Sequence, residues 1–160
     1  MGAWTHQPFD NDDAADWLAE LLEQDSMTMI VDAFCAVTRP ANDEDDGDEY
    51  IELPEASIAV AAALVLRLIS QPTYKLPDDA VPDQLLEDLR AWCQQFKTLK
   101  PTRKWYAAAL EAVKASTSKS NSELYEVWYE STEFGEWKKS VDGLSIYFKQ
   151  QLKRIDADQA

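Results

Sequence analysis

Residues 54–70 read Pro-Glu-Ala-Ser-Ile-Ala-Val-Ala-Ala-Ala-Leu-Val-Leu-Arg-Leu-Ile-Ser, and this stretch decides the fold. Apolar side chains occupy nearly every position of it instead of following one stripe, and Pro54 suits the first turn of a helix. A helix that is apolar on all sides is typical of a protein interior. We therefore predict a central buried helix over about residues 54–70.

Six further segments show apolar residues at helical spacing, and none reads as a β-strand. The first begins after Asp10 or Asn11, the second runs from near Ser26 to before Pro40, and Asn121 is expected to cap the sixth. The side chains expected to face the core are Trp17, Leu18, Leu21 and Leu22; Ile30, Val31, Phe34, Cys35 and Val37; Leu85, Leu86, Leu89, Trp92, Cys93 and Phe96; Trp105, Tyr106, Leu110 and Val113; Trp137, Val141, Leu144, Phe148, Leu152 and Ile155. The predicted fold class is all-α, a single-domain bundle of six or seven helices over residues 1–160.

Length and cysteine content favour one domain that needs no disulfide or metal. A chain of 160 residues with 46% apolar residues can bury a sizeable core. The two cysteines, Cys35 and Cys93, show no CxxC spacing and are expected to be buried thiols in a reducing compartment. With a single histidine, His6, no metal site and no cofactor are predicted.

The charge of the chain is −15 and is unevenly distributed. Residues 1–96 contain 21 acidic and 4 basic side chains, whereas residues 97–160 contain 9 acidic and 11 basic side chains. Nucleic-acid binding relies on Lys and Arg, so no nucleic-acid partner is expected. A strongly acidic field favours a protein partner with a basic surface, although solubility alone also explains such a charge.

The acidity is most concentrated in residues 41–53, an expected solvated loop in which seven of thirteen residues are acidic and none is basic. An EF-hand register with Gly47 at its sixth position would place Leu53 where a bidentate Glu is needed, so a calcium site is not predicted. The carboxylates of this loop are instead the first candidates for partner binding: Asp43, Glu44, Asp45, Asp46, Asp48, Glu49 and Glu52.

Aromatic residues crowd the C-terminal part, where they can fill the core or form a binding surface. Tyr125 and Tyr129 lie four residues apart beside Trp128, so they share a helix face near the surface and are the second candidates for partner binding. The N-terminal arm, residues 1–11, contains Trp4 and Phe9, which are expected to pack onto the bundle.

No pattern of residues indicates a catalytic centre. Asp12, Asp13 and Asp16 could be combined with His6 into a hydrolytic site, but capping of a helix start explains the same carboxylates. Four glycines in total leave no phosphate-binding loop. No secretory signal and no membrane span are recognised, so a cytoplasmic location is expected.

Three blocks resemble an uncharacterised bacterial family, a domain of unknown function whose members begin Met-Gly-Ala-Trp-Gly-x-Gly-Pro-Phe. The first is Met-Gly-Ala-Trp-Thr-His-Gln-Pro-Phe at 1–9, in which Thr5 and Gln7 replace the two glycines of the family. The second is Leu-Pro-Glu-Ala-Ser at 53–57. The third is Asn-Ser-Glu-Leu at 121–124, followed by Trp128 and by Glu-Trp at 136–137. The resemblance implies no established activity.

The sequence therefore predicts a non-catalytic protein-binding domain, with an acidic immunity or inhibitor protein against a basic bacterial partner as its most concrete form. Two alternatives stay open. One is an enzyme of unrecognised type, with a site near the N-terminal arm and the first helix. The other is a domain that binds a small molecule or peptide along the C-terminal aromatic residues.

Overall fold

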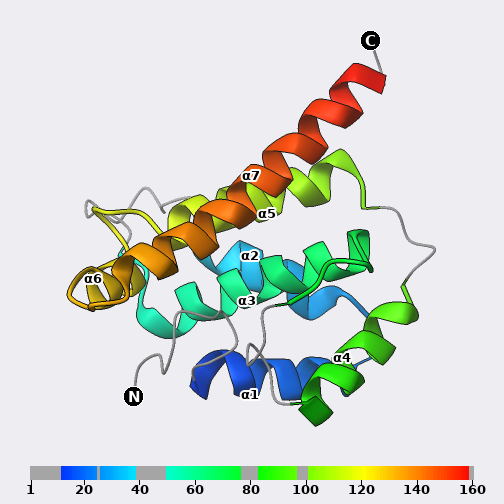
Figure 1. Ribbon diagram of the computed structural model, residues 1–160, viewed down its shortest axis with the longest axis horizontal. Coiled ribbons are helices and arrows are strands. Elements are labelled where there is room, and N and C mark those ends of the chain that lie inside the picture. Colours follow the sequence, from blue (N-terminus) through cyan, green and yellow to red (C-terminus); the bar gives the residue numbers. More distant parts are fainter. Residues whose placement is uncertain (1–11, 25, 39–49, 77–82, 97–100, 159–160) are drawn as a thin grey trace, which may run out of the picture.

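The computed structural model describes residues 12–24, 26–38, 50–76, 83–96 and 101–158, and these residues form seven helices (Figure 1). Their bounds are α1 Asp12–Leu21, α2 Thr28–Thr38, α3 Leu53–Ser70, α4 Asp83–Gln94, α5 Arg103–Ser116, α6 Glu123–Tyr129 and α7 Phe134–Asp158. Within these ranges no β-strand is present, and the β-type pairing consists of one isolated bridge between Ile51 and Ser122. The all-α helical bundle predicted from the sequence is confirmed.

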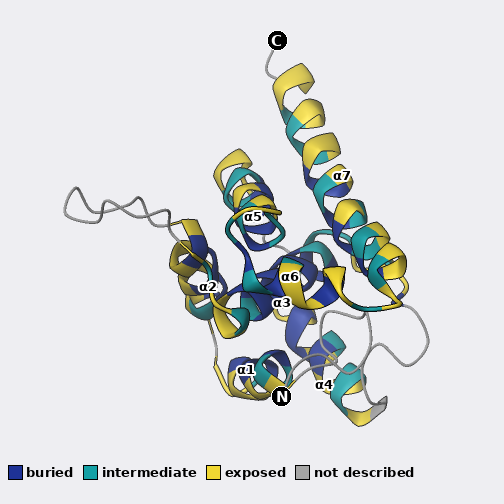
Figure 2. Cartoon of the chain, turned by 90° about the vertical axis from the view of Figure 1, so that its left-hand side faces the viewer, coloured by how far each residue is buried: buried dark blue, intermediate teal, exposed yellow. Residues whose placement is uncertain are grey.

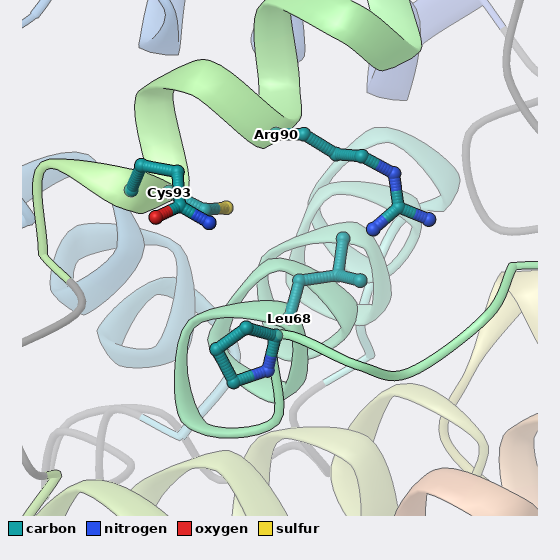
Figure 3. Close-up of a pocket in the computed structure, with 5 residues that line it drawn as sticks. Leu68, Arg90 and Cys93 are labelled. Atoms are coloured by element: carbon teal, nitrogen blue, oxygen red, sulfur yellow. The ribbon is translucent and has the colours of Figure 1, made fainter.

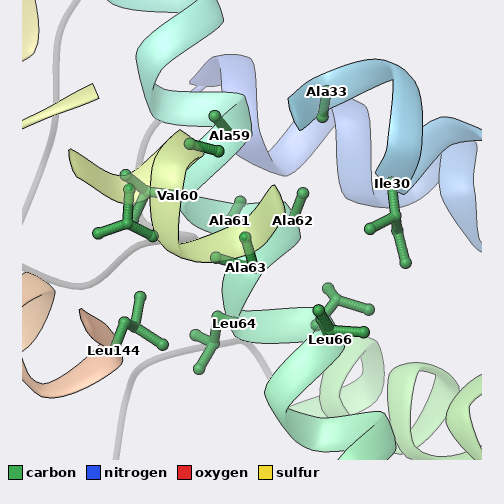
Figure 4. Packing of buried hydrophobic residues seen from close by; sticks show 14 of the residues in the cluster. Ile30, Ala33, Ala59, Val60, Ala61, Ala62, Ala63, Leu64, Leu66 and Leu144 are labelled. Carbon is green, nitrogen blue, oxygen red and sulfur yellow. The ribbon is translucent and has the colours of Figure 1, made fainter. Parts of the chain in front are cut away.

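Helix α3 is the centre of the bundle, as residues 54–70 predict. Each of the other six helices contacts it, and its ribbon lies between α1 and α4 on one side and α5 and α7 on the other (Figure 1). Twelve of its eighteen residues are buried. Small side chains at positions 59 and 61–63 let α2 and α5 approach its backbone closely, while Leu64 and Leu66 fill the space beyond (Figure 4).

By length and composition, α3 would also suit a membrane span. Its mean hydropathy is 1.7, and among the residues that the structure describes it is the one helix that is long and apolar enough to cross a membrane. However, 67% of the helix is buried by the rest of the protein. The core of the bundle therefore accounts for its apolar composition.

Helix α2 presents a narrower apolar face than the sequence predicts. Ile30, Phe34 and Val37 are buried against α3 and α5 as expected, but Val31 and Cys35 are exposed. Both partners of α2 lie on one side of it, and each successive residue is turned by about 100° around a helix. Side chains one position beyond Ile30 and Phe34 therefore point to solvent, and the prediction of a buried Cys35 thiol is wrong.

The remaining helices bury most of the predicted core. Trp17 of α1, Leu89 and Trp92 of α4, Val113 of α5 and Phe148 of α7 are all buried. Towards the C-terminal end of α7 the burial decreases, and exposed residues predominate there (Figure 2). The side chains of this predicted core that are only partly buried are Leu22, Leu85, Leu86, Phe96, Trp105, Leu152 and Ile155.

Arg67 is the one basic residue of the predicted central helix, and it packs against two aromatic rings. Its guanidinium carbon lies 3.8 Å from the ring centroid of Tyr74 and 4.6 Å from that of Tyr147. Such cation–π contacts offset part of the cost of removing the charge from water. One turn further along, the hydroxyls of Ser70 and Tyr147 are hydrogen-bonded at 2.6 Å. This polar strip joins the end of α3 to α7.

Candidate functional site

Helix α6 begins directly after a serine whose hydroxyl makes two hydrogen bonds. Ser122 is the N-cap, and its hydroxyl accepts a hydrogen bond from the backbone N–H of Tyr125 at 3.2 Å. The same hydroxyl donates to the carbonyl of Ser116, the last residue of α5, at 2.5 Å. The cap thus lies one residue after Asn121, the residue that the sequence indicates. Because Ser122 is fully buried, these bonds fix the start of α6 against the end of α5.

The segment that precedes α3 holds α6 from the other side. The Ile51 N–H donates to the Asn121 carbonyl at 2.7 Å, and the Glu123 N–H donates to the Ile51 carbonyl at 3.0 Å. The Leu53 N–H, at the start of α3, donates to a carboxylate oxygen of Glu123 at 3.0 Å. Glu123 therefore caps a helix that lies 70 residues earlier in the chain. The end of the predicted acidic loop is consequently hydrogen-bonded to α6 at Ile51 and Leu53, while Tyr50 and Glu52 remain exposed.

Tyr50 extends this contact onto the exposed side of α6. Its hydroxyl donates to a carboxylate oxygen of Glu126 at 2.6 Å. This hydrogen bond is the main reason that the pKa of Tyr50 is raised to about 12, with partial loss of hydration and the negative charges of Glu126, Glu123 and Glu52 adding to the effect. Three carboxylates are thus close enough to Tyr50 to disfavour its ionised form.

Five aromatic rings form a continuous cluster beneath and beside α6. The rings of Tyr125 and Tyr129 are stacked with centroids 5.9 Å apart, and both meet the edge of Phe134 at 5.4 Å. Trp128 and Trp137 are buried and stacked on each other at 6.0 Å. The rings pack against one another, so they fix α6 on the start of α7 and leave no open groove between them for a ligand.

The cluster ends in an exposed aromatic and acidic surface. Tyr129 is 62% exposed and Tyr50 is 49% exposed, which is unusual for such large rings. Residues 122–137 contain five Glu and no Lys or Arg. We call this surface the α6 surface and define it as Tyr50, Glu52, Glu123, Glu126, Tyr129 and Glu130.

The structure brings together part of the predicted partner-binding residues. Glu52 is exposed and belongs to the α6 surface, where Tyr129 also lies. Tyr125 is half-buried and supports Tyr129 from below. The other loop carboxylates (Asp43, Glu44, Asp45, Asp46, Asp48 and Glu49) lie outside the described residues, as do the N-terminal arm and His6.

Sequence reasoning missed Tyr50 and Glu126 as members of one surface. They are 76 residues apart, and neither belongs to a local pattern that points to the other. One signal was available, because five Glu without a cation in residues 122–137 contrast with the positive balance of the C-terminal part.

Cys93 does not have the surroundings of a nucleophile. Cys93 lines a cavity of about 50 Å³ together with Leu68 and Arg90, between α3 and α4 (Figure 3). Burial raises the pKa of its thiol to about 12, and the nearby Arg90 opposes this shift only weakly. The cavity has room for a few water molecules but not for a substrate. Among the described residues, no group of three or more His, Cys, Asp or Glu side chains could hold a metal ion.

Comparison with other proteins identifies a family but no activity. No curated protein and no solved structure matches the chain. A sequence profile described as a domain of unknown function (DUF4259) matches residues 2–140. The matched residues include the whole α6 surface and the first six helices. Because the match covers most of the chain, this protein belongs to the DUF4259 family, as the three sequence blocks predict.

Proposed function

We propose that this domain is a non-catalytic protein-binding module whose α6 surface binds a partner with a basic surface. The observation that carries the proposal is the exposure of Tyr129 and Tyr50 among four carboxylates. Tyrosine is enriched at the centres of protein interfaces, because a large ring with few rotatable bonds adds contact area at a low entropy cost. The charge of −15 further favours a basic partner, because it speeds the association of oppositely charged proteins.

The chemistry of the α6 surface supports a partner that presents Arg or Lys. A guanidinium or ammonium group can lie over the ring of Tyr129 and still reach the carboxylates of Glu126 and Glu130, at positions three residues before and one residue after it. The rings of Tyr125 and Phe134 pack against the Tyr129 ring, so little side-chain freedom would be lost on binding. The most concrete form of this proposal is an acidic immunity or inhibitor protein that neutralises a basic bacterial protein.

A capture experiment with a matched control tests the proposal. Wild-type protein, Tyr129→Ala and Ile146→Ala would each be immobilised and exposed to native lysate at low and high salt. Ile146 of α7 is 54% exposed and lies outside the α6 surface, so Ile146→Ala removes a comparable exposed apolar side chain. We expect a basic protein that binds wild-type and Ile146→Ala at low salt, dissociates at high salt, and is lost from Tyr129→Ala.

Titration calorimetry of the captured partner then gives the size of the effect. Tyr129→Ala should weaken binding at least tenfold. A variant in which Asp43, Glu44, Asp45 and Asp46 are replaced by Asn or Gln measures how much the charge of the acidic loop contributes to the binding affinity. A partner that binds Tyr129→Ala as tightly as wild-type, or that ignores salt, would contradict the proposal.

A further inference from the structure

A second surface feature lies between α1 and α4, both of which pack on α3. It is an open groove of about 430 Å³. Its lining consists of Ala19 of α1 with Leu22 and Glu23 directly after that helix, and of Leu85, Asp88, Ala91 and Trp92 of α4 with Gln95 directly after that helix. At the bottom, the indole N–H of Trp92 donates to the carbonyl of Gln24 at 2.8 Å. This bond joins the end of α1 to α4 and fixes the position of the Trp92 ring.

The shape of the groove suits a helix better than a compact ligand. The lining positions of α4 run from Leu85 to Trp92 and share one helix face, so at 1.5 Å per residue this wall of the groove is about 10 Å long, or two turns. Ala19 and Ala91 are exposed and small, which leaves space for a third helix to approach the other two closely. Amphipathic helices commonly bind in grooves of this kind, with contacts every three or four residues.

The chemistry of the groove defines the occupant further. Leu22, Leu85 and Trp92 provide an apolar floor, whereas the charged residues of the lining are Glu23 and Asp88 and include no Lys or Arg. The described residues 12–24 around the α1 side contain five acidic and no basic side chains. An occupant must therefore combine an apolar stripe with positive charge along its edges.

We propose that the α1–α4 groove binds an amphipathic helix of another protein, with a Leu-type stripe on the floor and Lys or Arg side chains paired with Glu23 and Asp88. The site does not depend on the α6 surface, because α4 and α6 lie at different ends of the molecule (Figure 1). It gives the domain a second means of protein binding, one that recognises helical periodicity as well as charge.

A synthetic peptide of fourteen residues tests this proposal. It carries Leu at positions i, i+3, i+4 and i+7 with Lys on both edges, and its scrambled isomer has the same composition and charge. The readout is the indole N–H signal of Trp92 in ¹⁵N-labelled protein, identified by its absence in Trp92→Phe. We expect the patterned peptide to shift this signal and to bind at least tenfold more tightly than the scrambled isomer.

Two matched substitutions locate the binding. Ala91→Arg places a bulky cation in the groove and should weaken binding at least tenfold, whereas Ala36→Arg introduces the same change at an exposed site on α2 and should leave it unchanged. Ala19→Arg repeats the test from the opposite wall, and circular dichroism establishes that each variant is folded. Equal binding of both peptides, equal affinity of Ala91→Arg and Ala36→Arg, or loss of binding in Tyr129→Ala would overturn the proposal. So would a dimer in analytical ultracentrifugation that Ala91→Arg abolishes, because the occupant would then be a second copy of this chain.

Discussion

Helices α3 and α6 differ in length and in the share of their residues that is buried. α3 has eighteen residues, twelve of them buried, and its sequence alone predicts its position. α6 has seven residues, of which only Leu124 and Trp128 are buried. Isolated helices shorter than about 12–15 residues are marginal in water, so α6 depends on its neighbours. The comparison shows a division of tasks, in which one helix provides stability and the other presents a surface.

The contacts of α6 explain how such a short helix is held. Ser122 joins it to α5, Glu123 joins it to the start of α3, and the rings of Phe134 and Trp137 pack against it. Exposed ion pairs contribute little to this arrangement. The pairs found among the described residues, such as Arg103–Asp156, lie elsewhere, and pairs of this kind are worth at most about 1 kcal/mol.

The largest expected effect concerns α3. Leu66→Ala should lower the free energy of unfolding by about 3 kcal/mol, because Leu66 is fully buried and its loss leaves a cavity that the close-packed helices cannot refill. Urea unfolding measures this loss. Leu152→Ala on α7 is the control and should cost only about 1 kcal/mol, since Leu152 is half-buried. Equal losses would mean that α3 is not the main source of stability.

A smaller effect is expected where α6 begins. Ser122→Ala removes the N-cap bond and leaves the buried carbonyl of Ser116 without its partner, so it should cost about 2 kcal/mol. The near-ultraviolet circular dichroism of the aromatic cluster should change as well. Ser120→Ala, at an exposed position two residues earlier, should stay within about 0.5 kcal/mol of wild-type. If both variants behave alike, α6 is not held by its cap.

The third prediction concerns the hydrogen bond between Tyr50 and Glu126. Glu126→Gln removes the negative charge, so the pKa of Tyr50 should fall from about 12 towards its usual value near 10. Because the pKa is raised in the folded state, this bond contributes stability that is fully present below pH 10 and is lost as the pH rises towards 12. Absorbance titration at 295 nm, with Tyr50→Phe to identify the signal, measures the shift. An unchanged titration would place Tyr50 outside the α6 surface.

The smallest effect on stability is expected at the residue with the largest expected effect on binding. Tyr129→Ala should change the free energy of unfolding by no more than about 0.5 kcal/mol, because the ring is 62% exposed and its stacking on Tyr125 is partly solvated. Thermal unfolding followed by circular dichroism is sufficient to measure this. A loss above 2 kcal/mol would indicate that Tyr129 belongs to the core, and the comparison between α3 and α6 would fail.

The helices were predictable from the sequence because their signals are local. Residues 54–70 have no polar face, which permits only a buried position. The errors occur where the outcome depends on tertiary neighbours. Cys35 and Phe34 are adjacent and similarly apolar, and only the position of α3 and α5 decides which of them is buried. Asn121 and Ser122 are both good N-caps, and the nearby carbonyl of Ser116 favours the serine.

The candidate site was predictable only in part. Tyr129 and Glu52 carry visible signals, namely an aromatic pair at helical spacing and a run of acidic residues. Neither signal predicts that the segment of Glu52 lies beside α6, because this arrangement arises from a bridge between Ile51 and Ser122. A bridge between two single residues does not repeat along the chain, so no periodic pattern in the sequence predicts it.

That bridge also has a kinetic consequence. The bonds from Tyr50 and Leu53 to α6 close loops of 76 and 70 residues, whereas the bond between Ser122 and Ser116 closes a loop of six. Long loops lose more chain entropy on closing, so the contact between α5 and α6 at Ser116 and Ser122 should form before α6 is joined to Tyr50 and Leu53. The reverse order applies to opening, in which the α6 surface can detach while the centre stays folded. Exposed members of this surface that make no bond to α3, such as Tyr129 and Glu130, can therefore change with little effect on the folding of the bundle.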